Sequence, residues 1–175
     1  SHNPKEYNGY KIYDETGCQS VPHEAAKVVA EINKITDYFD IDHSKNHELI
    51  QYVGKDVDDV YINEVKKIIL RPDLKKDFKV VYTPLHGTGN EPVQKVLEEL
   101  GFSNVYVVPE QELPNGNFPT VDYPNPEDIK AFDLALKLAK KQDADLVLAT
   151  DPDADRLGVL AKDSKTGEYM SFTGN

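Results

Sequence analysis

Three aspartates at alternate positions, followed by an arginine, form the sequence feature with the clearest chemistry: Asp151, Asp153, Asp155 and Arg156. They come directly after the apolar run 146–149, which predicts a strand whose end presents a ligand-binding loop. In an extended loop, residues two apart point the same way, so the carboxylates can converge on one hard cation such as Mg²⁺, which prefers oxygen ligands. Without a cation they would repel one another. The spacing therefore predicts a divalent-metal site.

Other interpretations of this acidic motif are a solvated turn, a calcium loop and an aspartate nucleophile. A solvated turn rarely follows a buried strand so tightly. A calcium-binding EF-hand loop needs Gly and Glu at its sixth and twelfth positions, which here are Arg156 and Lys162. A nucleophile of the haloacid-dehalogenase type would also follow a strand, but its companion motifs are not obvious in the chain, so it stays a minor alternative.

Two further segments carry polar groups. The glycine-bearing loop 83–90 joins a predicted strand to the start of a predicted helix, where free backbone N–H groups favour anions. It lacks the P-loop pattern and has only G-x-G of the dinucleotide fingerprint, so nucleotide binding is not supported. The loop is equally consistent with a structural turn, and its His86 with a hydrogen-bonded or a catalytic residue. The opening segment offers a hydroxyl, an imidazole and an ammonium, on Ser1, His2 and Lys11, but by composition it is only a polar turn.

Segments with strand-like and helix-like patterns alternate along the chain. Apolar residues at three- and four-residue steps predict helices over 22–36, 57–70, 92–100 and 127–141, with one face of the first buried in a core. Gly101 is well placed to cap the third helix. Strands are expected over 10–13, 78–82, 105–108, 146–149, 157–161 and 169–172, the last two as a hairpin.

This alternation predicts an α/β fold with a mixed, mainly parallel sheet flanked by helices. We expect one domain over 72–172, preceded in 1–71 by the C-terminal part of another domain and a connecting helix. Residues 173–175 would then begin the link to a third domain.

Composition excludes several classes of protein. The 175 residues carry 31 acidic and 20 basic side chains, a formal charge of −11, which disfavours binding to nucleic acid or to an anionic membrane surface. No run approaches the roughly 18 apolar residues of a membrane helix. A single cysteine, Cys18, and the lack of a signal-peptide profile predict a cytoplasmic protein. Because the only methionine is Met170, we expect the chain to be a fragment.

Three motifs together carry a family resemblance. They are the opening S-H-N-P-x-x-Y-N-G-x-K, the loop T-P-L-H-G-T-G and the acidic D-P-D-A-D-R, in that order. The set resembles the α-D-phosphohexomutases, the phosphoglucomutase and phosphomannomutase family. The resemblance runs from late in that family's first domain, through its second, to the entry of the third. It implies that domains III and IV are missing partners and that the fragment alone is inactive.

The resemblance also implies roles for individual residues. Ser1 would carry a phosphoryl group and, through it, help Asp151, Asp153 and Asp155 to hold Mg²⁺. Lys11 would be the general acid/base and contact the substrate, and His2 would lie next to the active phosphate. Arg156 would bind the phosphoserine or a sugar bisphosphate through paired N–H groups. The implied substrate is a hexose phosphate, with glucose 1,6-bisphosphate as the priming intermediate.

One departure from the family pattern leaves the substrate open. Pro152 stands where many members have Gly. In this it resembles the subgroup of phosphoglucomutases and phosphopentomutases, and all three carboxylates of the motif are still present. A phosphomannomutase or phosphopentomutase is therefore an alternative to a phosphoglucomutase. A non-catalytic relative that binds sugar phosphates, and a phosphatase with an aspartate nucleophile, are rivals from other classes.

Overall fold

The computed structural model describes residues 1–7, 11–41 and 51–172. Contacts divide the chain into two compact units, one formed by Ser1–Tyr7 with Lys55–Asn175 and the other by Asn8–Gly54. The helix α2 (Lys55–Lys66) belongs by contact to the first unit. The domain boundary at residue 71 stays a sequence prediction, and the expected link 173–175 lies outside the described residues.

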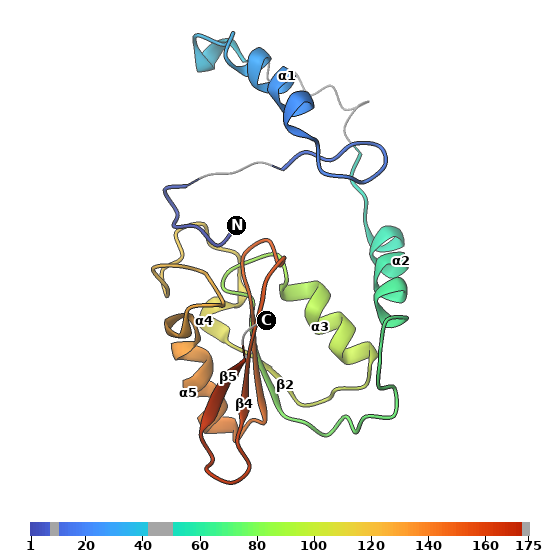
Figure 1. Ribbon diagram of the computed structural model, residues 1–175, viewed down its shortest axis with the longest axis vertical. Helices are drawn as coiled ribbons and strands as arrows, with labels where there is room; N and C mark the ends of the chain where they lie inside the picture. The colour runs from blue at the N-terminus through green and yellow to red at the C-terminus, as the bar shows by residue number, and fades with distance from the viewer. Residues whose placement is uncertain (8–10, 42–50, 173–175) are drawn as a thin grey trace. The chain divides into compact units, whose positions relative to one another are not determined.

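A five-stranded sheet forms the centre of the first unit, in the order β2-β1-β3-β4-β5 (Figure 1). Its strands are β1 (Val80–Thr83), β2 (Val105–Val107), β3 (Leu146–Thr150), β4 (Leu157–Lys162) and β5 (Tyr169–Phe172). The pairs β1–β2 and β1–β3 are parallel, and the pairs β3–β4 and β4–β5 are antiparallel. The predicted mixed sheet and its terminal hairpin are confirmed. Two of the strand pairs are parallel and two are antiparallel.

Helices cover the sheet because its central strands are apolar toward both faces. Figure 1 shows α5 (Asp133–Gln142) on one side of the sheet and α3 (Asn90–Glu99) on the other. On the α5 side, alternate residues of the central strands pack against the helix and the turn before it. This core includes Val81, Val147, Ala149, Leu160, Phe132, Ala135 and Ala139.

Several predicted helices begin or end differently in the structure. The segment predicted as one helix over 127–141 starts with the 3₁₀ turn η3 (Ile129–Phe132), because Asp128 accepts a hydrogen bond from the Lys130 N–H and caps that turn. A short helix that was not predicted, α4 (Pro109–Glu112), follows β2. The Gly101 cap is confirmed, with a φ of 90° and its N–H bonded to the Glu98 carbonyl.

The second unit contains α1 (Pro22–Ile32) and the 3₁₀ turn η1 (Tyr38–Asp40). Asp14 closes a turn before α1 by accepting hydrogen bonds from the N–H groups of Thr16 and Cys18. The predicted burial of one face of the first helix is wrong, because no residue of α1 is buried. Val28, Val29 and Ile32 are each 42–56% exposed, since nothing in the described part of this unit covers them. The predicted strand 10–13 begins outside the described residues, and its last residue, Tyr13, makes only an isolated bridge to Gln19.

Among the described residues, no helix combines the length and the apolar character needed to cross a membrane.

Gly158 in β4 marks the closest approach between the sheet and the loop before η3. A Cβ built there would lie 2.3 Å from the Pro126 carbonyl oxygen and 2.8 Å from the Phe132 ring. We expect Gly158→Ala to lower the free energy of unfolding by about 1–3 kcal/mol, because backbone must move to admit the methyl group. Urea unfolding measures this. Gly116→Ala, where a Cβ would meet nothing within 4 Å, is the matched control, and equal effects of the two changes would contradict the packing described.

Candidate functional site

The three aspartates converge on one turn directly after the central strand β3. One carboxylate oxygen from each of Asp151, Asp153 and Asp155 lies within 4.8 Å of the others. The predicted convergence is confirmed, but the extended loop assumed for it is wrong. The Ala154 N–H donates to the Asp151 carbonyl at 2.9 Å, and Ala154 has a φ of 58°, so the chain turns back on itself. A left-handed residue inside the motif brings the carboxylates together.

Asp151 is the buried member of the cluster. Its Oδ1 accepts a hydrogen bond from the Arg156 N–H at 3.1 Å. Its Oδ2 is also buried and receives no hydrogen bond from any donor in the part of the chain that the structure describes. Burial raises the pKa of Asp151 to about 6, with further increases from the contact with Asp153 and from the charges of Asp153 and Asp155. The described residues therefore do little to stabilise the negative charge of an ionised Asp151, and a bound cation would stabilise it.

The loop 83–90 packs against the aspartate turn. The Thr88 N–H donates to the Pro152 carbonyl at 2.8 Å, and Cβ atoms at Gly87 and Gly89 would collide with Pro152 and with the Tyr82 and Thr150 hydroxyls. Of the two interpretations left open by the sequence, these contacts favour the structural one. They also show why the loop contains two glycines at these positions: no side chain fits.

His86 in the same loop is buried, and both of its ring nitrogens are used. Nδ1 lies 3.1 Å from the Leu113 carbonyl oxygen and Nε2 lies 2.9 Å from Thr120 Oγ1. Of the alternatives for His86, the hydrogen-bonded loop residue is the one observed.

Ser1 lies beside the aspartate turn, although about 150 residues separate them in the sequence. The amino-terminal ammonium of the chain, on Ser1, forms an ion pair with Asp153 Oδ1 at 2.6 Å. The Ser1 hydroxyl accepts a weak hydrogen bond from the Asn3 N–H at 3.3 Å, and His2 next to it is half-buried. The structure thus brings Ser1 to the carboxylates, while the phosphoryl-carrying role of Ser1 and the role of His2 remain predictions.

The side chain of Arg156, directly after the aspartate turn, forms an ion pair with Glu127, a residue that sequence analysis did not identify. Its guanidinium Nη1 donates to Glu127 Oε1 at 2.9 Å, across a separation of 29 residues that no local pattern links. Glu127 is 71% exposed, so this ion pair contributes little stability and a phosphate can replace the carboxylate at small cost. The phosphate-binding role of Arg156 remains a prediction.

Lys11, the predicted general acid/base, belongs to the unit Asn8–Gly54. Its role at the site remains a prediction.

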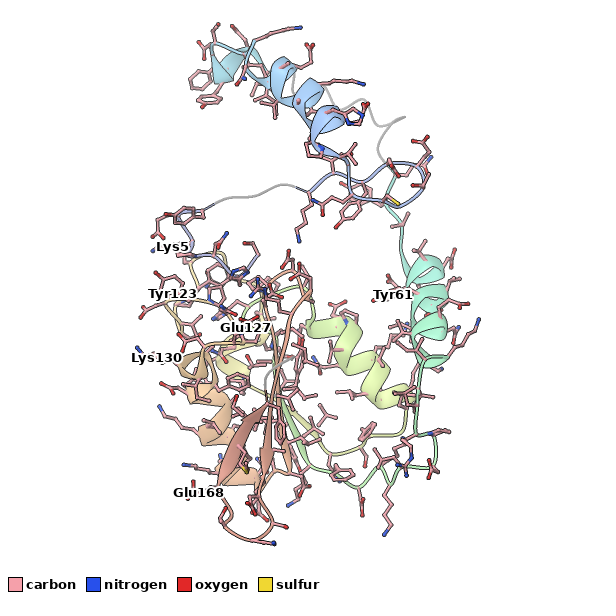
Figure 2. All side chains as sticks on the ribbon, in the orientation of Figure 1. Lys5, Tyr61, Tyr123, Glu127, Lys130 and Glu168 are labelled. Atoms are coloured by element: carbon pink, nitrogen blue, oxygen red, sulfur yellow. The ribbon has the colours of Figure 1, made fainter. Side chains whose placement is uncertain are left out.

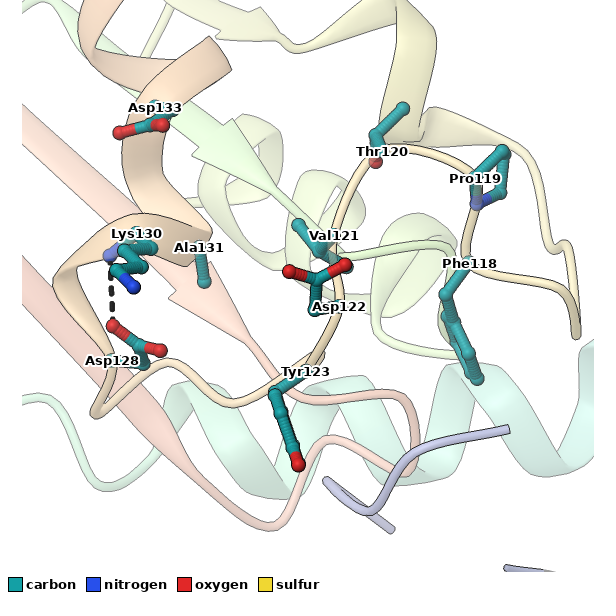
Figure 3. Close-up of a pocket in the computed structure, with 10 residues that line it drawn as sticks. All are labelled: Phe118, Pro119, Thr120, Val121, Asp122, Tyr123, Asp128, Lys130, Ala131 and Asp133. Carbon is teal, nitrogen blue, oxygen red and sulfur yellow. Dashed lines mark hydrogen bonds between the residues drawn. The ribbon is translucent and has the colours of Figure 1, made fainter. Parts of the chain in front are cut away.

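A pocket of about 440 Å³ lies beside the loop that leads into η3 (Figure 3). Asp122, Tyr123 and Phe118 line it, together with Asp128, whose side chain is already used to cap η3. None of the three converging aspartates lines this pocket. The metal-site candidate is therefore a surface turn with one buried ligand, separate from this hollow.

The raised pKa of Asp151 predicts a pH-dependent stability in metal-free solution. Because the folded pKa of about 6 exceeds the ordinary 3.8, the folded state binds the extra proton, and the contribution of Asp151 to stability falls as pH rises from about 4 to about 6. Asp151→Asn removes this loss, so at pH 7.5 without metal the variant should unfold with a free energy about 1–3 kcal/mol higher than the original. Thermal unfolding from pH 4 to 8 tests this, with exposed Asp122→Asn as control; a less stable Asp151→Asn at pH 7.5 would contradict it.

Comparison with known proteins places these features in a family. The description "Phosphoglucomutase/phosphomannomutase, alpha/beta/alpha domain II" matches residues 59–166, and the corresponding domain I matches residues 1–39. A phosphoglucomutase of Staphylococcus saprophyticus is 42% identical over 180 residues, which cover 100% of this chain and 32% of that protein. A phosphoribomutase of Saccharomyces cerevisiae is 40% identical, covering 100% and 31%. A phosphomannomutase of Mycoplasmoides pirum is 38% identical, covering 94% and 31%.

Solved structures agree in fold. A phosphoglucomutase/phosphomannomutase family protein of Burkholderia thailandensis superposes with a TM-score of 0.52 at 27% identity, over 68% of this chain and 24% of that one. The chain spans about a third of the length of the curated relatives named above. On the family match over more than half of its residues, this chain belongs to the phosphoglucomutase/phosphomannomutase family.

Proposed function

We propose that this chain supplies the phosphoserine segment and the metal-binding domain of a Mg²⁺-dependent phosphohexomutase. The observation that carries the proposal is the convergence of three carboxylates within 4.8 Å on a turn that also contacts Ser1. Two chemical groups, a metal ion and a phosphoryl group, would then share one place on the surface. The relatives' names, phosphoglucomutase, phosphoribomutase and phosphomannomutase, support phosphoryl transfer on sugar phosphates as the reaction class.

The residues of the turn fit Mg²⁺ in type and in charge. Asp151, Asp153 and Asp155 offer only oxygen ligands, which Mg²⁺ prefers, and the buried Asp151 Oδ2 lacks a donor among the described residues. Burial, with smaller contributions from the neighbouring Asp153 and Asp155, raises the pKa of Asp151, and a bound cation would lower it again. When bound, the ion supplies positive charge against the transferring phosphoryl group.

In the proposed reaction, four residues of this chain have defined roles. The P–O bond to Ser1 Oγ breaks as a sugar hydroxyl bonds to the same phosphorus; Lys11 takes the hydroxyl proton, and the departing Ser1 oxygen takes up a proton to become a free hydroxyl. The Ser1 hydroxyl then bonds to the other phosphorus of the resulting bisphosphate, the P–O bond to the sugar breaks, and the proton that Ser1 loses ends on the sugar oxygen. Arg156, released from Glu127, holds a phosphate through its N–H groups. His2 would stand beside the phosphoserine. The net change is an isomerised sugar monophosphate with no hydrolysis.

The sugar and the complete turnover depend on more than this chain. Relatives that differ in named substrate are 38–42% identical to it, so this segment does not separate hexose from pentose phosphates. Glucose phosphates, primed by glucose 1,6-bisphosphate, are the first substrates to test, because a phosphoglucomutase has 42% identity. We further propose that turnover requires the domains that make the relatives about three times longer.

Removal of the Ser1 hydroxyl should abolish the phosphoenzyme. After incubation of the full-length protein with glucose 1,6-bisphosphate, intact-mass measurement should show one added phosphoryl group on the original and none on Ser1→Ala. The mutase rate of the variant should fall by more than about a thousand-fold, because no other nucleophile replaces the hydroxyl. Ser103→Ala is the control at an exposed serine. A Ser1→Ala protein that still becomes phosphorylated would reveal a different acceptor.

Asp153→Asn should weaken Mg²⁺ binding and mutase turnover together. The loss of one of three charged ligands is expected to reduce the affinity by about ten-fold or more, as measured by titration calorimetry on the full-length protein. Asp122→Asn, an exposed aspartate outside the cluster, should leave both quantities unchanged. Unaltered Mg²⁺ affinity and rate in Asp153→Asn would remove the metal assignment.

A further inference from the structure

The carbonyl of Pro152, between two of the converging aspartates, accepts two hydrogen bonds from one residue of the neighbouring loop. The Thr88 N–H lies 2.8 Å from this oxygen and the Thr88 hydroxyl lies 3.1 Å from it. The peptide bond that joins Pro152 to Asp153 is thereby fixed in orientation. Thr88 itself is exposed, so its hydroxyl is not needed to fill a core.

Close packing leaves the aspartate turn little freedom on this side. A Cβ at Gly87 would lie 2.3 Å from Pro152 Cα, and one at Gly89 would lie 2.7 Å from both the Thr150 and the Tyr82 hydroxyl oxygens. These two hydroxyls are hydrogen-bonded to each other at 2.8 Å where β3 ends. Residues 87–89 therefore support the start of the aspartate turn at three consecutive positions.

The backbone that presents Thr88 is held in an unusual conformation. Leu85 and His86 have φ values of 46° and 62°, and the turn closes through a hydrogen bond from the Gly87 N–H to the Pro84 carbonyl at 2.8 Å. Left-handed backbone at residues other than glycine costs of the order of 1–3 kcal/mol and persists only where the surroundings enforce it. Something must therefore fix Leu85 and His86.

A chain of buried and part-buried hydrogen bonds supplies that constraint, and the direction of each bond follows from the carbonyl at one end. The Leu113 carbonyl can only accept, so His86 Nδ1–H donates to it, and in a neutral ring Nε2 then accepts from the Thr120 hydroxyl. Thr120 in turn accepts from Gln111 Nε2, Gln111 Oε1 accepts from the Thr83 hydroxyl, and Thr83 accepts from the Leu85 N–H. This chain of hydrogen bonds ties the left-handed turn to the segment after β2.

We propose that Thr88 is a positioning residue for the metal site: its hydroxyl, on a backbone fixed by the His86–Thr120–Gln111–Thr83 chain, holds the Pro152 carbonyl so that the aspartates stay converged before the cation arrives. The proposal rests on the function proposed above. Support from outside the ligand shell commonly changes metal affinity by ten-fold or more, because it sets ligand orientation in advance.

Three threonine variants of the full-length protein test the proposal. Thr88→Val removes the hydroxyl and keeps the shape, whereas Thr88→Ser keeps the hydroxyl. Thr166→Val is the control, at an exposed position in the β4–β5 hairpin two residues before Glu168, which lies well away from Glu127 (Figure 2). Mg²⁺ affinity is measured by titration calorimetry, and thermal unfolding without metal is measured in parallel.

We expect Thr88→Val to bind Mg²⁺ about ten-fold more weakly than the original, with an unchanged metal-free unfolding temperature. Thr88→Ser should restore the affinity and Thr166→Val should match the original. Equal affinity in Thr88→Val and the original would overturn the positioning role and leave the metal assignment intact. Equally weak binding by the valine and serine variants would overturn it too, because the hydroxyl would not be the cause. If the original does not bind Mg²⁺, the proposed function fails, and this inference with it.

Discussion

Three carboxylates on one turn repel one another, so the rest of the sheet unit must hold this turn in place. β3 is hydrogen-bonded on both sides, to β1 and to β4, so the backbone position of Asp151, directly after this strand, is fixed. Asp151 starts the turn from a fully buried position, which raises its pKa, and one of its oxygens has no donor among the described residues. Rigid backbone support therefore holds the cluster in place.

That support comes from a loop with no Asp, Glu, Lys or Arg among residues 83–89. Two glycines admit the Pro152 backbone and the hydroxyls at the strand ends, and a buried histidine is used entirely for structure. Loops at the carboxyl ends of β1 and β3 thus act as one assembly, since parallel neighbouring strands end at the same edge of the sheet. The family match supports the proposed reaction class, and these contacts explain how the three carboxylates are held in place.

Local patterns predicted most of what depends on local chemistry. The strands of the sheet, the terminal hairpin, the Gly101 cap and the aspartate cluster were all predicted from the sequence, because periodicity and residue type determine them. The turn at Ala154 was not, since alanine gives no sign of left-handed backbone, and the extended loop expected there was wrong. The burial of α1 was also wrong, because burial depends on a covering layer that the described residues of its unit do not contain. The Arg156–Glu127 pair joins distant positions, which no local pattern reveals.

The central claim is that Asp151, Asp153 and Asp155 hold a divalent cation beside Ser1. A crystal structure of the protein grown with Mg²⁺ tests it most directly. The account predicts one ion at roughly 2.1 Å from an oxygen of each of the three carboxylates, with Ser1 adjacent to it. A well-ordered turn without an ion at saturating Mg²⁺, or an ion bound by other residues, would contradict it.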